Sequence, residues 1–123
     1  MGKISFTNIS TVTLAVKRMA SSIEFYTKLG MIVTYGGPES GFTTLRSGDV
    51  VLNLILHSGD SPAWWGRVIL RVGDVDQIYS HLLEAGLNPD TPRNADWGER
   101  FFHIWDPDGH ELSFAELLPH TNQ

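Results

Sequence analysis

The chain has 123 residues, 41% of them hydrophobic, which is enough for one ordinary globular domain with its own core. It contains no cysteine, which excludes disulfides, thiolate metal sites and cysteine nucleophiles. The formal net charge is −5 with Lys and Arg scattered, which argues against a nucleic-acid surface. No apolar run approaches the ~18 residues that span a bilayer, and the first residues lack a secretion signal. We therefore expect a cytoplasmic protein whose partner is a small organic ligand, with no nucleic acid and no membrane.

An internal repeat organises the chain. Residues 11–16 alternate two faces as a strand does, and residues 67–72 do the same 56 residues later, from residue 11 to residue 67. In both halves the next segment, residues 19–29 or 74–85, places apolar side chains at helical spacing. The sequence therefore predicts a strand followed by a helix in each half.

Each predicted helix stops at a glycine, Gly30 or Gly86, because glycine best accepts a left-handed cap. Short extended segments follow the helices. They are residues 31–35, 42–46 and 50–57 in the first half, and residues 87–89, 100–105 and 110–116 in the second. Both halves are therefore predicted to run strand, helix, strand, strand, strand.

The last two segments form a predicted hairpin. The motif D-P-D-G at residues 106–109 lies between them, with Pro and its preset φ at the second turn position and Gly at the fourth. This is type I turn chemistry. The two modules then cover about residues 8–57 and 67–118, with a join at 58–66.

Two motifs resemble a known family. The pattern W-G-x-R, an aromatic strand and D-P-D-G-H-E over residues 97–111 resembles the C-terminal signature of the vicinal oxygen chelate superfamily. That superfamily holds glyoxalase I, extradiol dioxygenases, fosfomycin-resistance enzymes and bleomycin-resistance proteins. The run Asp96–Arg100 is most similar to the bleomycin-resistance branch, and S-x-x-F-Y-x-x-x-L-G at residues 22–30 is also family-like. The resemblance implies an α+β fold, with two repeated βαβββ modules forming a curved, cavity-bearing mixed sheet in a single domain over residues 1–123.

One family residue is missing. Family members usually carry Asp near Arg18, where it starts the first helix, so we expect Ser21 or Ser22 to cap that helix instead.

Strand alternation predicts which side chains face the cavity. The apolar residues of the first and fifth strands should pack on the helices: Val12, Leu14, Val16, Val68, Leu70 and Val72. The intervening residues should face the cavity: Thr11, Thr13, Ala15, Arg67, Ile69 and Arg71. A register error of one residue would invert this assignment.

In metal-dependent relatives, four strand positions supply His or Glu ligands. The resemblance places Thr11, Asn53, Arg67 and Ser113 at these positions, and none of them is a usual ligand for a divalent transition metal. We therefore expect no metal ion or other cofactor. The alternative is a divalent metal in a rebuilt site. Its candidate ligands are His57, His103, His110 and Glu111, of which the histidines could instead be partly exposed side chains.

The remaining candidates lead to two interpretations each. Trp97 lies where relatives of the resistance branch place a ligand-contacting aromatic ring, and it either stacks on a planar ligand or covers the sheet edge. Arg67 and Arg71 either bind an anionic or carbonyl-rich ligand or pair with acids such as Glu111 or Asp49.

His103 shares its face with Phe101 and Trp105, so it either lines a pocket or belongs to a core. Trp64 and Trp65 are expected at a contact between halves or subunits. The predicted ligand-binding set is Thr11, Thr13, Asn53, Arg67, Arg71, Trp97, His103 and Ser113.

These residues predict a metal-independent small-molecule binding protein rather than an enzyme, and the resemblance implies that it sequesters an antibiotic. One alternative is a metal-dependent lyase or dioxygenase with displaced ligands, and a second is a non-catalytic protein-interaction module. Bleomycin-type antibiotics are cationic, which suits a charge of −5 but not two inward arginines. Relatives of this size usually form homodimers, which would also cover open strand edges.

Overall fold

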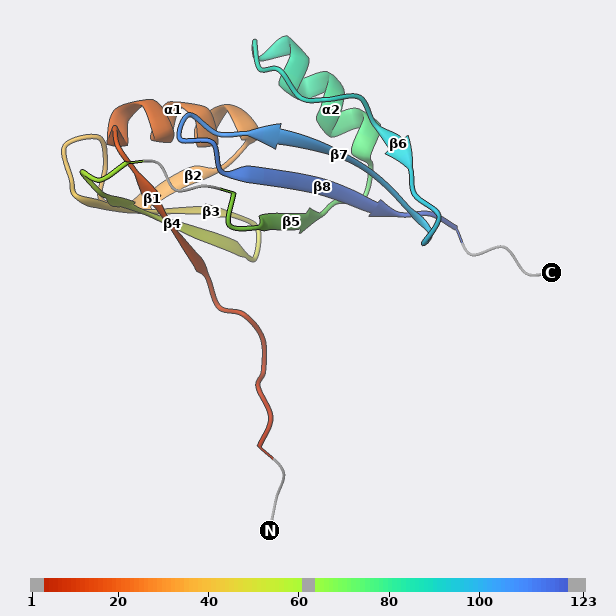
Figure 1. The fold of residues 1–123 in the computed structure, drawn as a ribbon, viewed down its shortest axis with the longest axis horizontal. Coiled ribbons are helices and arrows are strands. Elements are labelled where there is room, and N and C mark those ends of the chain that lie inside the picture. The colour runs from red at the N-terminus through yellow and green to blue at the C-terminus, as the bar shows by residue number, and fades with distance from the viewer. Residues whose placement is uncertain (1–3, 61–63, 120–123) are drawn as a thin grey trace. The chain divides into compact units, whose positions relative to one another are not determined.

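The computed structural model describes residues 4–60 and 64–119. The chain divides into two compact units, Met1–Ser58 and Gly59–Gln123. In each unit a strand and a helix are followed by three strands (Figure 1). The repeated βαβββ pattern is therefore confirmed. Among the described residues, no helix has the length and hydropathy that crossing a membrane requires.

The first unit is a four-stranded mixed sheet with one helix. Its elements are β1 (Val12–Val16), α1 (Met19–Leu29), β2 (Ile32–Tyr35), β3 (Phe42–Ser47) and β4 (Val50–Leu56). The strand order is β1-β4-β3-β2, with β1 parallel to β4 and the other pairs antiparallel. Each observed boundary lies within about one residue of the predicted one, which is within the usual uncertainty of element ends.

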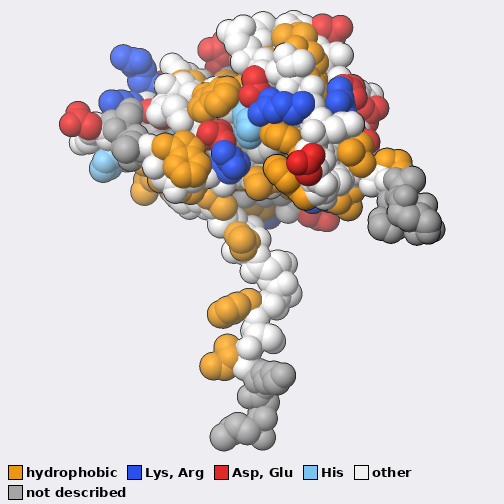
Figure 2. Space-filling model, turned by 45° about the vertical axis from the view of Figure 1, so that its right-hand side comes forward, with side chains coloured by type: hydrophobic (Ala, Val, Ile, Leu, Met, Phe, Trp, Pro, Cys, Tyr) orange, Lys and Arg blue, Asp and Glu red, His pale blue; other side chains and the backbone are white. Residues whose placement is uncertain are grey.

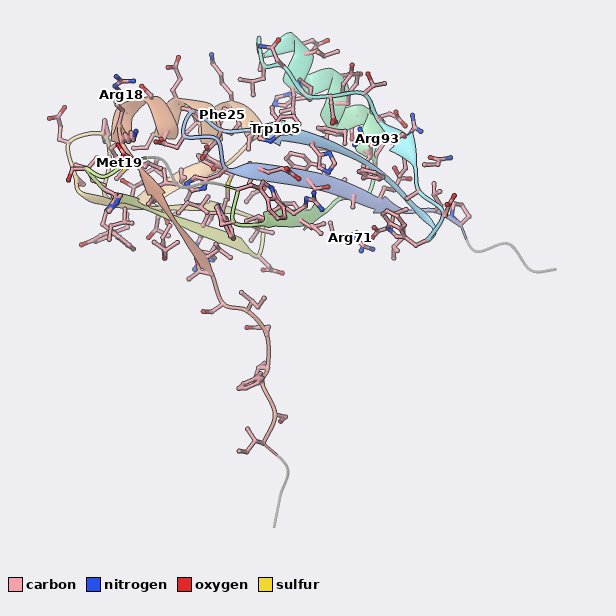
Figure 3. All side chains as sticks on the ribbon, viewed as in Figure 1. Arg18, Met19, Phe25, Arg71, Arg93 and Trp105 are labelled. Atoms are coloured by element: carbon pink, nitrogen blue, oxygen red, sulfur yellow. The ribbon has the colours of Figure 1, made fainter. Side chains whose placement is uncertain are left out.

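The core of the first unit lies between the sheet and α1, which contacts β2 and β4. Leu14 and Val16 are buried on β1, whereas Thr13, on the opposite side, is exposed and Ala15 is half-buried. From the helix, Met19 and Phe25 (Figure 3) are buried with Tyr26. The predicted division of β1 into a helix-facing side and an opposite side is confirmed.

The start of α1 differs from the prediction. The residue before the helix is Arg18, which has extended backbone angles and makes no side-chain capping bond. Ser22 N–H already donates to Arg18 O at 3.1 Å, so Ser22 lies within the first turn and is buried there. The prediction that Ser21 or Ser22 caps α1 is wrong, because the helix begins two residues before Ser21, at Met19. The predicted end is confirmed, since Gly30 has a left-handed φ of 117°.

The second unit repeats this arrangement. Its elements are β5 (Arg67–Arg71), α2 (Val75–Glu84), β6 (Arg93–Asn94), β7 (Glu99–Trp105) and β8 (Glu111–Leu117). The order is β5-β8-β7-β6, with β5 parallel to β8 and the other pairs antiparallel.

The short strand after α2 was predicted at residues 87–89, and that prediction is wrong. The ladder to β7 begins only at Arg93, which pairs with Phe101. Pro89 and Pro92 lack a backbone N–H and cannot donate to a ladder. In the described structure, the preceding segment makes one backbone–backbone hydrogen bond to β7, from Asp90 N–H to His103 O at 2.9 Å.

The hairpin between β7 and β8 is confirmed. Gly109 N–H donates to Asp106 O at 2.9 Å and closes the predicted turn. The Asp106 side chain also accepts from the backbone N–H groups of Asp108 and His110, at 2.9 and 2.8 Å. This turn sets the β7–β8 register, in which His103 lies opposite Ser113.

Alternation along β5 also follows the prediction. Val68 and Leu70 are half-buried, and the intervening Arg67, Ile69 and Arg71 are exposed. The two arginines therefore share one face of the second sheet with Ile69 between them.

Candidate functional site

A row of aromatic rings runs along the outward face of β7. Phe101, His103 and Trp105 share this face because alternate side chains of a strand point the same way, while Phe102 and Ile104 are buried on the other. The Trp97 ring, in the turn before β7, stacks on Phe101 with centroids 6.0 Å apart and planes 23° apart. His103 lies 5.3 Å from Phe101 and 6.1 Å from Trp105. The rings therefore form a continuous surface.

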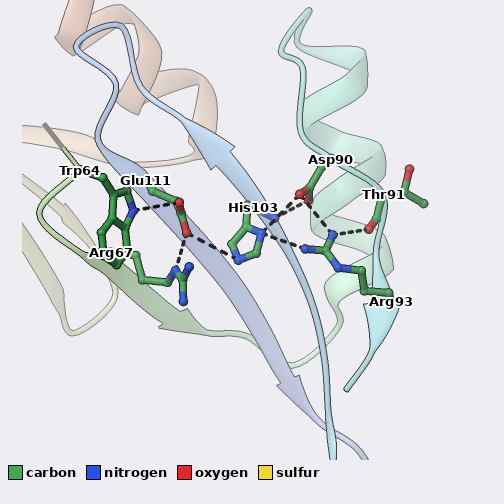
Figure 4. Close-up of polar contacts among 7 residues, drawn as sticks. All are labelled: Trp64, Arg67, Asp90, Thr91, Arg93, His103 and Glu111. Atoms are coloured by element: carbon green, nitrogen blue, oxygen red, sulfur yellow. Dashed lines mark hydrogen bonds and ion pairs between the residues drawn. The ribbon is translucent and has the colours of Figure 1, made fainter. Parts of the chain in front are cut away.

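Glu111 lies opposite Trp105, at one end of this surface, and its contacts are drawn in Figure 4. One carboxylate oxygen accepts from Trp64 Nε1 at 3.1 Å, and the other forms an ion pair with Arg67 Nε and lies 3.7 Å from His103 Nε2. The Arg67 guanidinium carbon lies 5.7 Å from the centroid of the Trp64 ring. Burial raises the pKa of Glu111, but the hydrogen bonds from Arg67 and Trp64 outweigh burial and hold this pKa below its usual range.

Glu99 makes a matching set of bonds at the other end. Its Oε1 accepts from Trp97 Nε1 at 2.8 Å, and its Oε2 accepts from Arg71 Nη2 at 2.8 Å. We call Trp64–Glu111–Arg67 the first triad and Trp97–Glu99–Arg71 the second triad. In both, one carboxylate joins an indole N–H to an arginine of β5.

A third ion pair lies beside the aromatic row. Arg93 Nη1 is 3.2 Å from Asp90 Oδ2, and its guanidinium carbon lies 4.5 Å from the centroid of the Phe101 ring. The His103 ring contacts both charges, with Nδ1 at 3.0 Å from Arg93 Nη2 and 3.3 Å from Asp90 Oδ2. Burial raises the pKa of Asp90, but bonds from the His103 amide and from Arg93 outweigh burial and lower it.

Short side chains fill the middle of this face. On β8, Ser113 lies between Ile69 and His103, and Ala115 lies between Arg71 and Phe101. Both short side chains are buried. Longer side chains from β5 and β7 therefore flank the central strand.

The charges of this face are balanced. Arg67, Arg71 and Arg93, from β5 and β6, each pair with a carboxylate, supplied by Glu111, Glu99 and Asp90 respectively. Figure 3 labels Arg71, Arg93 and Trp105 on their strands, and Figure 2 shows acidic, basic and histidine side chains intermixed with hydrophobic ones. The arginines therefore do not give this face an excess of positive charge.

The predicted residues of the first unit make hydrogen bonds within that unit. Thr44 Oγ1 donates to Asn53 Oδ1 at 2.8 Å, and Asn53 Nδ2 donates to Thr13 Oγ1 at 3.3 Å. Thr11 Oγ1 donates to Val51 O at 3.0 Å. Thr44 was not predicted, although its position opposite Asn53 in the β3–β4 register would have indicated it.

The four positions that carry metal ligands in relatives do not fit a divalent metal. Thr11 and Asn53 use their side chains in the hydrogen bonds just described, Arg67 is a cation paired with Glu111, and Ser113 offers a neutral hydroxyl. Within residues 4–60 and 64–119, no group of three or more His, Asp or Glu side chains is placed to hold a metal ion.

Within the second unit, the residues of the alternative metal site are only partly brought together. His103 and Glu111 are neighbours, but Glu111 is also engaged by Arg67. His110 is buried, and its Nδ1 accepts from Trp65 Nε1 at 2.9 Å, so the expectation of a partly exposed His110 is wrong. The Trp65 ring lies edge-on to the His110 ring, with centroids 6.0 Å apart, and covers it.

Several residues of this face were not predicted. The partner of Arg67 was among the acids considered, whereas Glu99, Asp90 and Arg93 were not. The sequence did offer a signal for Glu99, because this residue lies directly before the predicted strand 100–105 and two residues after Trp97. Trp64 and Trp65, expected at a contact between halves or subunits, donate within their own unit to Glu111 and His110.

Comparisons with known proteins agree with this architecture. Residues 8–114 match the family model of the Glyoxalase/Bleomycin resistance protein/Dioxygenase superfamily. A bleomycin resistance protein of Geobacillus stearothermophilus is 30% identical over 129 residues, covering 89% of this chain and 96% of that protein. A crystal structure of a bleomycin-binding protein complexed with bleomycin has a TM-score of 0.78 and 26% identity, covering 89% of this chain and 98% of its own. A bleomycin resistance determinant encoded on the transposon Tn5 has a TM-score of 0.79 and 26% identity, covering 90% and 98%. The chain therefore belongs to the glyoxalase/bleomycin resistance protein/dioxygenase superfamily.

Proposed function

We propose that this protein binds a small organic ligand without a metal ion, and that the ligand is an antibiotic such as the bleomycin bound by its structural relative. The observation that carries the proposal is the continuous aromatic row of β7, flanked by ion-paired arginines. Trp97 is 71% exposed, so one face of its ring is open to a ligand. Exposed flat rings stack on planar ligands and bury large apolar areas at low entropic cost.

Electrostatics supports the metal-free part of the proposal. A guanidinium cannot lose its proton at accessible pH. At ~4 Å from a dication, Arg67 would be repelled by about 1 to 4 kcal/mol per unit charge product, depending on the effective dielectric constant, and by twice that for two charges. Thr11, Asn53 and Ser113, at the other three metal-ligand positions of relatives, are neutral and do not compensate for this repulsion, and the charge of Glu111 is already paired with Arg67.

The ion pairs also reconcile the arginines with a cationic ligand. Glu111 and Glu99 neutralise Arg67 and Arg71, so the face does not present the excess positive charge that the arginines alone would give. The net charge of −5 then favours the approach of cations over long distances. A cationic antibiotic is therefore electrostatically compatible with this site.

Calorimetric titration of the purified protein with metal-free bleomycin tests the proposal. The protein is first treated with a chelating resin, and parallel titrations contain EDTA or added zinc. We expect saturable binding of the same affinity in all conditions, accompanied by quenching of tryptophan fluorescence. Absence of binding, or binding only after metal addition, would contradict the proposal.

The proposal includes a homodimer in the cytoplasm. In the described sheets, β1 and β5 each pair on one side only and leave an edge. Open strand edges are usually paired or covered, and a second copy of the chain is the simplest cover. Light scattering at micromolar concentration tests the dimer, and cell fractionation tests the location. A monomer at all concentrations would remove the dimer from the proposal.

A further inference from the structure

The two triads repeat one bonding pattern at two places on the same face. In each, a carboxylate accepts an indole N–H with one oxygen and pairs with an arginine of β5 through the other. Among the residues of the two triads, only Arg67 lies at a position that carries a metal ligand in relatives. The repeated Trp–Glu–Arg pattern is a feature of this face that metal binding does not explain.

Each arginine keeps donors for a ligand. Arg67 uses its Nε on Glu111, and Arg71 uses its Nη2 on Glu99. Within the described part of the chain, their other guanidinium nitrogens make no hydrogen bond, and the two side chains are 41% and 51% exposed. Guanidinium N–H groups have a fixed planar geometry that suits carbonyl or carboxylate oxygens.

The glutamates decide which of these acceptors is favoured. A ligand carboxylate placed on Arg67 would be attracted by the guanidinium but repelled by the Glu111 carboxylate, which is already bound to it. A carbonyl oxygen can accept the same N–H groups without that repulsion. The low pKa of Glu111 means that its negative charge is present at neutral pH.

The spacing of the triads sets the length of the ligand. Arg67 and Arg71 are four residues apart on one strand, which corresponds to about 13 Å at the usual rise per residue. Ile69 lies between them and is 59% exposed, beside the short Ser113. The middle of the site is therefore apolar and its two ends are hydrogen-bond donors.

From this geometry we infer that the site binds an elongated planar ligand with an uncharged carbonyl at each end, and that Glu111 and Glu99 exclude anionic ligands. Arg67 and Arg71 donate to the two carbonyl groups, and the ring system of the ligand lies over Ile69 against the aromatic row. This inference rests on the proposed function and specifies the chemical class of its ligand.

A matched pair of probes tests the inference. The para,para′-dicarboxamide of biphenyl and the corresponding dicarboxylate have the same length and ring system and differ in charge. Affinities are measured by calorimetry and tryptophan fluorescence for the wild-type protein, Glu111→Gln and Glu99→Gln. Asp76→Asn is the control, because it removes one carboxylate that pairs with Arg100, outside the two triads.

We expect the wild-type protein to bind the dicarboxamide at least about tenfold more tightly than the dicarboxylate. In each glutamate variant this ratio of affinities should fall by about tenfold. Asp76→Asn should keep the wild-type preference. Thermal unfolding checks that each variant is folded. Glu99, whose side chain is 20% exposed against 9% for Glu111, provides a second test if Glu111→Gln is unstable.

Unchanged preference in both glutamate variants, or binding of neither probe by any of the proteins, would overturn the inference. A protein that binds bleomycin but shows no such change would keep the proposed function and lose only the ligand class inferred for its site.

Discussion

Replacing Arg67 with methionine removes the guanidinium that balances Glu111 and keeps a long apolar side chain. Glu111, whose side chain is 9% exposed, would then have Trp64 as its remaining hydrogen-bond donor, with His103 nearby. Breaking a fully buried ion pair costs about 3–5 kcal/mol. Arg67 is 41% exposed, so water already weakens this pair. We therefore expect Arg67→Met to lower the free energy of unfolding by about 1–3 kcal/mol.

Urea unfolding at neutral pH, followed by circular dichroism, measures this loss. Arg100→Met is the control, because Arg100 pairs with the more exposed Asp76, and we expect a smaller loss there. The double variant Arg67→Met, Glu111→Gln should recover part of the loss, since it removes the unbalanced charge itself.

The same effect predicts a dependence on pH. The pKa of Glu111 is lowered on folding from an ordinary value of 4.5, so its ion pair stabilises the protein above that pH. This stability is lost as the pH falls through the lower folded-state pKa. The difference between the wild-type protein and Arg67→Met should therefore shrink under acid conditions. Equal losses in Arg67→Met and Arg100→Met, or no recovery in the double variant, would refute the reasoning.

Three further predictions concern single residues. Trp97→Ala should weaken bleomycin binding by at least about tenfold, which is within the energy of one aromatic stacking contact, and Trp97→Phe should retain most of the affinity; equal affinities in titration calorimetry would assign Trp97 to the sheet edge. Gly36→Ala should unfold at a much lower urea concentration than Gly48→Ala: both glycines have positive φ, but only at Gly36 would a Cβ lie 2.2 Å from a backbone oxygen, that of Phe42. Similar urea midpoints would show that the chain relaxes around the added methyl group. Asp106→Ala should lower the free energy of unfolding by about 1–3 kcal/mol, because two backbone N–H groups of the hairpin turn lose their acceptor. An unchanged urea midpoint would mean that water replaces the carboxylate.

The repeated elements were predictable because each depends on a local pattern. Alternation and helical spacing predicted the boundaries of most strands and both helices to within about one residue of the observed ones, and glycine indicated where the helices end. The failures were also local. The short strand lies at Arg93–Asn94 rather than at residues 87–89, because the prolines at positions 89 and 92 cannot donate to a ladder. The first helix begins at Met19 without a side-chain cap.

The site was less predictable because its contacts join distant residues. Arg67 and Glu111 are 44 residues apart, and Arg71 and Glu99 are 28 apart. Their pairing depends on strand order and register, which bring β5 beside β8 and β8 beside β7. Glu111 was one of the two acids named as partners of the arginines, but the matching role of Glu99 emerges only when both strands are in place.

A crystal structure of the protein grown with bleomycin and a chelator tests the central claim most directly. We predict a planar part of the antibiotic against Trp97 and Phe101, with the Arg67–Glu111 ion pair intact and no metal ion bound by protein side chains. A metal ion held by His103 and Glu111, or an antibiotic bound away from this face, would contradict the account.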